Sequence, residues 1–414
     1  MYLISYIIIL LNNKTFKKAN ISFLLYLPII DSLHNMLPGT GIGGHYIAPI
    51  ILIFIYLSGY SSFYLPSKKY MIIFFIVLIA SIFFSSDFIL SSNKVLGFIS
   101  AIICYPMYFF LFHKLDESQK KIFFRNIIIS LTLFAIYISF STFLKWGLHP
   151  SEYASSSYKY AFIYLGRLGF YSLHSFSVML VMLIIIYKYK NGNISLLLLY
   201  SIVLIILFLI LKRSYFFVPL IGGFIAFLTV DRKIVATILF MVSISLLLNN
   251  NYLFDTFLNL RNVNLDTSYL EENRFLEFIN YKYEIIDMYP MKNILFGTEI
   301  FNSEGKFFWK LGIIDDRGDR ILHSDYTHIL YGAGIIGFLL YLSFLVIIIR
   351  DYFFLKVKSK NIFIFASIYS IIIIMGFFDG GLYYSNRIFH FAFLGFILAD
   401  ISTTKFKEVN NERE

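Results

Sequence analysis

Two histidines and an aspartate lie close together where a polar stretch gives way to an apolar run. The stretch reads His323-Ser-Asp-Tyr-Thr-His328. A neutral imidazole near pH 7 suits a general base that takes a proton from a hydroxyl group. His323, with Asp325 beside it, is therefore the first candidate for acid–base chemistry, and the alternative for His323 is a histidine that caps a helix. His323 and His328 fit one helical face poorly, so we expect no metal site.

Three arginines are candidates for binding an anionic substrate. Arg167 comes just before an apolar segment, Arg213 lies in a short turn between two apolar segments, and Arg274 lies in a polar stretch. A guanidinium group stays charged and forms fixed bidentate pairs with phosphate, which suits a lipid diphosphate. Two alternatives stay open: Arg213 could be a charged signal at the membrane boundary, and Arg274 could lie on an exposed helix face.

The elements that must position these residues are apolar segments that follow one another at short intervals. We find them at residues 2–11, 21–30, 46–60, 70–84, 95–112, 127–144, 170–187, 194–211, 215–230, 234–248, 329–349, 362–378 and 388–399. The strongest, 194–211, is about 27 Å long as a helix, close to the ~30 Å hydrocarbon thickness of a bilayer. The expected fold class is all-α, a polytopic transmembrane helical bundle of about 12 spans.

One long polar stretch, residues 249–328, interrupts the apolar segments. Within it, Ser268-x-x-Glu271 is a capping-box pattern that opens an amphipathic helix over 271–289, with Ile286 on its apolar face. The pattern therefore predicts one long extracytoplasmic loop that contains an amphipathic helix. The expected divisions are an N-terminal transmembrane bundle over 1–248, the long loop over 249–328, and C-terminal transmembrane helices with a cytoplasmic tail over 329–414.

Composition and charge favour a membrane protein with a defined orientation. The chain is 58% hydrophobic and 14% charged, whereas soluble domains carry about 25% charged residues. If the long loop is outside, most Lys and Arg of the short loops fall on the inside, as the positive-inside rule requires. The net charge of +10 does not predict a nucleic-acid partner, because the basic residues are scattered between apolar runs.

Several common kinds of active site are missing from the sequence. There is no Gly-rich phosphate loop ending in Lys-Ser/Thr, no His-Glu-x-x-His and no Gly-x-Ser-x-Gly. These absences argue against ATP use and against the corresponding metalloprotease and hydrolase chemistry, and we expect no cofactor. Cys104 is the one cysteine, so no internal disulfide is possible.

The stretch from His323 to Gly337 resembles a pattern of the O-antigen ligase and O-antigen polymerase superfamily. That pattern is His-Asn/Ser followed by Gly-Ile-Ile-Gly, and here the residues read His-Ser-Asp-Tyr-Thr-His-Ile-Leu-Tyr-Gly-Ala-Gly-Ile-Ile-Gly. Arg274 followed by Tyr289-Pro290 is similar to the family's Arg, then Pro-x-x-Gly stretch. The turn that begins Lys212-Arg-Ser-Tyr is similar to its Ser-Arg-Ser turn between two spans.

The resemblance implies a metal-independent glycosyltransferase in the bacterial inner membrane. It would polymerise oligosaccharide repeats carried on undecaprenyl diphosphate, on the periplasmic face, for O-antigen, lipopolysaccharide or capsule. His323 would be the base with Asp325 beside it, and Arg213 and Arg274 would hold the diphosphate. Arg167 matches a further outer-loop arginine by position alone. Membrane lipid, a flippase and a chain-length regulator would be its partners.

Two other functions remain open from the sequence. A ligase that moves the finished glycan to a lipid or protein acceptor would share the donor site. A transporter of lipid-linked oligosaccharide belongs to a different class, and such proteins commonly show paired broken helices in two halves. Pro106 and Pro219 interrupt apolar segments at positions that do not match, which favours an enzyme.

Overall fold

The structure, a computed structural model, describes a helical protein. The described residues are 53, 65–147, 170–189, 194–209, 213–228, 281–282, 286, 289–301, 324–355, 361–378 and 384–402. Every secondary-structure element in these ranges is a helix, and none of these residues forms a strand. The all-α part of the expected fold class is therefore confirmed for this part of the chain.

The helices follow the expected apolar segments closely. They are α4 (Pro66–Ile82), α5 (Phe88–His113), α6 (Glu117–Gly147), α7 (Phe170–Tyr189), α8 (Ile194–Leu209), α9 (Arg213–Phe227), α14 (Met291–Phe296), α15 (Asp325–Phe354), α16 (Ile362–Phe378) and α17 (Tyr384–Ile401). α5 starts earlier than the segment 95–112, because the side chain of Asp87 accepts a hydrogen bond from the Leu90 N–H and caps the helix. The expected segments 2–11, 21–30 and 234–248 lie outside the described residues.

Some of these helices are suited to a lipid bilayer. Three are long and apolar enough to cross a membrane, at Phe88–His113, Glu117–Phe140 and Asp325–Phe354, within the described ranges. Shorter apolar helices lie at Phe176–Ile186, Ser195–Leu207 and Ile362–Phe377. Large apolar side chains also point away from the bundle, with Ile76 62%, Ile136 59% and Leu198 59% exposed on α4, α6 and α8. This exposure is typical of helices that face lipid.

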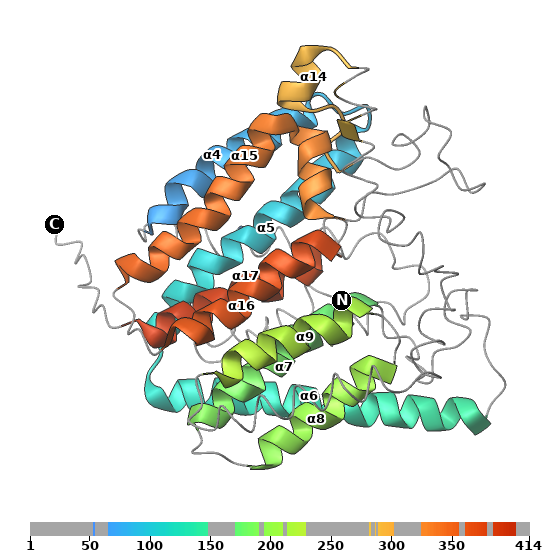
Figure 1. The fold of residues 1–414 in the computed structure, drawn as a ribbon, viewed down its shortest axis with the longest axis vertical. Helices are drawn as coiled ribbons and strands as arrows, with labels where there is room; N and C mark the ends of the chain where they lie inside the picture. Colours follow the sequence, from blue (N-terminus) through green and yellow to red (C-terminus); the bar gives the residue numbers. More distant parts are fainter. Residues whose placement is uncertain are drawn as a thin grey trace.

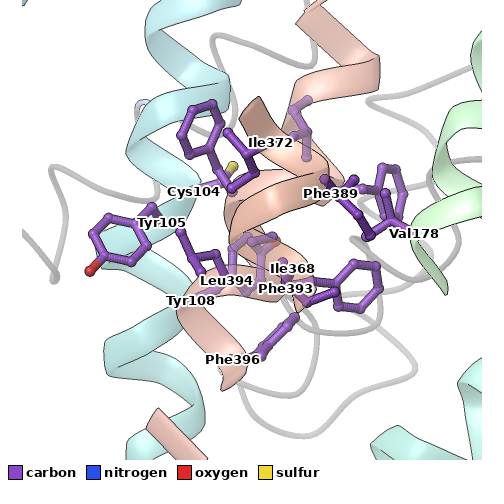
Figure 2. Close-up of a cluster of buried hydrophobic side chains, with 14 of the residues drawn as sticks. Cys104, Tyr105, Tyr108, Val178, Ile368, Ile372, Phe389, Phe393, Leu394 and Phe396 are labelled. Atoms are coloured by element: carbon purple, nitrogen blue, oxygen red, sulfur yellow. The ribbon is translucent and has the colours of Figure 1, made fainter. Parts of the chain in front are cut away.

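The centre of the bundle is the contact of α17 with α5. Figure 1 shows the two helices side by side, and a Cβ atom at Gly395 would collide with the backbone of α5 at Tyr105 and Phe109. Aromatic residues fill the rest of the contact, as between Tyr108 and Phe396, whose ring centroids are 5.0 Å apart. Figure 2 shows that α7 and α16 add to the same cluster, whose labelled residues are Cys104, Tyr105, Tyr108, Val178, Ile368, Ile372, Phe389, Phe393, Leu394 and Phe396. α17 is thereby held on several sides by close packing.

A buried carboxylate joins three helices where α4 begins and α15 ends. The Asp351 side chain accepts hydrogen bonds from the Ser67 N–H of α4, at 3.0 Å, and from the Tyr105 hydroxyl of α5, at 2.8 Å. The N-cap residue of α4, Leu65, has no side chain that can cap the helix. The Asp351 carboxylate, from a distant part of the chain, instead accepts a hydrogen bond from the first turn of α4.

Two further contacts join helix ends that are far apart in the sequence. After the ends of α15 and α17, the Ser402 hydroxyl donates to the Leu355 carbonyl at 3.5 Å, and Lys120 of α6 pairs with Asp400 of α17 at 3.5 Å. Between α4 and α5, the Ser85 hydroxyl donates to Glu299 at 2.8 Å, close to α14. We call this second place the α14 end.

Candidate functional site

Helix α15 is two helical pieces joined at Gly334. Gly334 has φ 66° and ψ −170°, a conformation that is essentially restricted to glycine. The first piece covers residues 325–333, and the second, 335–354, is about 30 Å long, which is long enough to span a bilayer core alone. In Figure 1 the first piece runs from the start of α17 up to α14, and the second returns beside α4. The single span expected at 329–349 is thus broken at Gly334, and its first residues belong to a short helix inside the bundle.

Close backbone packing against α14 explains the break. A Cβ atom at Gly334 would collide with the Leu295 carbonyl of α14, and one at Gly297, whose φ is 82°, would collide with Gly332. The Thr298 N–H donates to the Tyr331 carbonyl at 3.0 Å, which ties the segment after α14 to the first piece. The upper end of the first piece is therefore fixed by α14.

The lower end of the first piece is capped inside the bundle. The Ser324 hydroxyl accepts from the Tyr326 N–H at 3.2 Å as the N-cap. It also donates to the Gly376 carbonyl of α16 at 3.2 Å. Ser324 and Asp325 are both fully buried, so the first piece begins inside the bundle and not at its surface.

An ion pair fixes this lower end to α17. Arg387 Nη2 lies 2.5 Å from Asp325 Oδ2, and the two side chains are 3% and 1% exposed. Asp325 also lies in the first turn of its helix, where the helix dipole favours a negative charge. Both effects favour an ionised carboxylate at a place that water does not reach.

Two histidines extend this polar group along the same two helices. His328 lies three residues after Asp325 and His390 three residues after Arg387, so each shares a helical face with its charged neighbour. Both histidines are fully buried. The His328 ring is also 5.6 Å from the Phe301 ring, and the Phe301 carbonyl accepts from Lys94 of α5 at 3.0 Å. We call Asp325, His328, Arg387 and His390 the buried polar cluster.

The long loop reaches the first piece through Tyr281. Tyr281 packs in a small apolar cluster with Ile294, Leu330 and Tyr331, and burial raises the pKa of Tyr281 to about 12. Most of the amphipathic helix expected over 271–289 lies outside the described residues. Of those described, Ile286 is exposed, and Tyr281 is the residue that packs on α15.

The structure describes the predicted site only in part. Asp325 is in the buried polar cluster, and Arg213 is the first residue of α9, although its side chain lies outside the description. His323, Arg167 and Arg274 also lie outside the described residues. His323 is nevertheless joined by one peptide bond to Ser324, whose position is fixed by the contacts above.

Sequence reasoning missed Arg387 as a partner of Asp325. The signal was the repeated spacing, Asp-x-x-His at the start of one apolar run and Arg-x-x-His at the start of another. A charged side chain within an apolar helix is costly in free energy, so an aspartate and an arginine in two such patterns are expected to pair with each other.

The donor set of the described residues does not suggest a metal centre. No group of three or more His, Cys, Asp and Glu side chains that could hold a metal ion occurs among them. What the buried polar cluster offers is a carboxylate, an arginine and two imidazoles in an apolar setting. Comparison with known proteins adds no assignment, since no model of a protein family matches the chain and no curated protein is significantly similar to it.

Proposed function

We propose that this chain is a membrane glycosyltransferase that polymerises oligosaccharide repeats linked to polyprenyl diphosphate. The observation that supports it most is the buried Asp325–Arg387 ion pair directly after His323. Ionisable groups inside an apolar helical bundle are costly and mark functional sites more often than other residues do. In this chain the Asp325–Arg387 pair holds the short first piece of α15, and His323, the candidate base, is the residue before its N-cap Ser324.

The proposed reaction uses the bond energy of the donor. His323 takes the proton of an acceptor hydroxyl, the hydroxyl oxygen attacks the anomeric carbon, and the bond from that carbon to the phosphate oxygen breaks. The electron pair leaves on the polyprenyl diphosphate, whose charge Arg213, Arg274 and Arg167 stabilise. His323 then releases its proton to water. The step needs no nucleoside triphosphate, which suits a reaction on the periplasmic face of the inner membrane.

The first test compares the two histidines of the motif. Purified protein in vesicles receives lipid-linked repeats, and chain length is read as a ladder of glycans. His323→Ala should leave single repeats, with a loss of about 10²–10⁴-fold in rate, because a positioned base contributes that much. His328→Ala is the matched control, measured per folded protein because His328 is buried. It should retain most of the chain extension.

Other outcomes assign the protein differently. If His328→Ala abolishes extension and His323→Ala does not, the wrong histidine has been named. If the unaltered protein joins no repeats but transfers glycan to an added lipid or protein acceptor, it is a ligase. If repeats cross the vesicle membrane without forming any new bond, it is a transporter.

A further inference from the structure

Arg387 lies on the most firmly packed helix of the described bundle. α17 contacts α5 at backbone distance through Gly395, and its phenylalanines fill the shared core (Figure 2). Arg387 lies near the start of α17 and is 2% exposed. An arginine on such a helix has little freedom to move. It is therefore a fixed point to which another segment can be attached.

The segment attached to it is short and has few other anchors at that end. The first piece of α15 is held at its top by α14. At its bottom it is held by the Asp325–Arg387 pair and by two hydrogen bonds to α16, from the Ser324 hydroxyl to the Gly376 carbonyl and from the Tyr326 hydroxyl to the Ile373 carbonyl. A charge-assisted contact is stronger than a hydrogen bond between neutral groups. Arg387 is thus the strongest single anchor of Asp325 in α17.

The charge balance of the pair favours positioning over substrate binding. The guanidinium of Arg387 already faces the carboxylate of Asp325, so together they add no net positive charge to attract a diphosphate. A second anion beside Asp325 would be repelled in this apolar setting.

We infer that Arg387 is a positioning residue, which acts through Asp325 to hold His323 in place for proton transfer. This inference rests on the proposed function in one respect, that His323 is the base. A displacement of about 1 Å from a reactive geometry can reduce a rate by about 10²-fold, so the effect is measurable.

The kinetic test uses Arg387→Met, Arg387→Lys, Asp325→Asn and the double variant Asp325→Asn/Arg387→Met. The single Met variant leaves a buried carboxylate without its counter-ion, so the double variant removes both charges together. We expect Arg387→Met to lower kcat by about 10²-fold with KM for the lipid-linked repeat nearly unchanged. Arg387→Lys, which keeps the charge, should restore part of kcat. Arg125→Met, at an exposed position of α6, is the matched control and should behave as the unaltered protein.

The double variant separates positioning from the alternatives. If Arg387 acts through Asp325, then adding Arg387→Met to Asp325→Asn should cause no further loss of kcat per folded protein. A rise in KM in Arg387→Met, and additive losses in the double variant, would show that Arg387 binds the diphosphate. A loss of folded protein with unchanged kcat would show a structural role alone.

A second readout does not depend on the reaction. Cys104 is the one cysteine of the chain and is buried, so Cys104→Ser gives a background without thiols. A thiol placed by His323→Cys then reports its surroundings through its rate of reaction with a membrane-impermeant maleimide. Arg387→Met should change that rate at least several-fold, and Arg125→Met should not.

The two readouts distinguish the failure of each idea. If the unaltered protein joins no repeats, but the maleimide rate at position 323 still responds to Arg387, the proposed function fails and the positioning role stands. If the rate at position 323 is the same with and without Arg387, the positioning role is overturned, whatever the protein catalyses.

Discussion

At the scale of single residues, charge inside an apolar bundle is the informative property. Asp325 and Arg387 are nearly inaccessible to water, and each would be costly without the other. Removing one partner of a buried pair costs about 3–5 kcal/mol, whereas removing both is often nearly neutral. Stability measurements on this pair therefore need the double variant of Asp325 and Arg387 as well as the two single variants.

Arg213 allows a residue-scale prediction about phosphate recognition. Arg213→Lys keeps the positive charge at the start of α9 but loses the planar fork that binds phosphate through two hydrogen bonds. We expect long glycan chains to be lost while the amount of protein in the membrane stays normal. Lys212→Ala, one residue earlier, is the control and should leave the chains intact. Normal chains in Arg213→Lys would mean that the residue serves only as a charge at the membrane boundary.

At the scale of elements, the broken helix α15 is the feature that hydropathy does not reveal. Residues 329–349 are apolar throughout, so the sequence alone predicts one continuous span. The break depends on α14 and the residues that follow it, because Leu295 approaches Gly334, and Ile300 approaches Gly332, too closely for a side chain at either glycine. That contact joins two segments separated by part of the long loop, and no local pattern encodes it.

Gly334→Ala tests the break directly. An alanine at φ 66° is strained by about 1–3 kcal/mol, and its Cβ would collide with the Leu295 carbonyl. We expect a lower thermal midpoint in detergent and a loss of any activity that depends on His323. Leu339→Ala, at an exposed position of the same helix, should change the midpoint little. Equal midpoints for the two variants would show that the chain tolerates a continuous helix here.

At the scale of the whole molecule, hydropathy predicted the positions of the helices well. The expected segment 194–211 became α8 and the segment 362–378 became α16, because runs of Leu, Ile, Val and Phe are helical wherever lipid surrounds them. The sequence motif singled out Asp325, and its role in a site stays a prediction. The pairing of Asp325 with Arg387 was missed, because pairing between distant helices is decided by how the bundle packs.

Orientation gives a prediction for the whole chain. We expect the α14 end to be outside, because the long loop contains α14 and, with that loop outside, most Lys and Arg of the short loops fall on the inside. Reporters that work on one side of the membrane, fused after Ser303 and after Glu414, should therefore respond oppositely. Signals from the same side for both fusions would contradict this topology, and the proposed reaction with it.

The carboxylate of Asp351 has a consequence for the order in which the protein matures. It caps α4 through the Ser67 N–H, yet it lies 284 residues further along the chain. At a synthesis rate of about 5–20 residues per second, roughly 15–60 s separate the two groups. During that time the first turn of α4 and the Tyr105 hydroxyl have been synthesised, but their acceptor has not. The earliest helices of the described bundle therefore reach their final packing only when one of the latest has been synthesised.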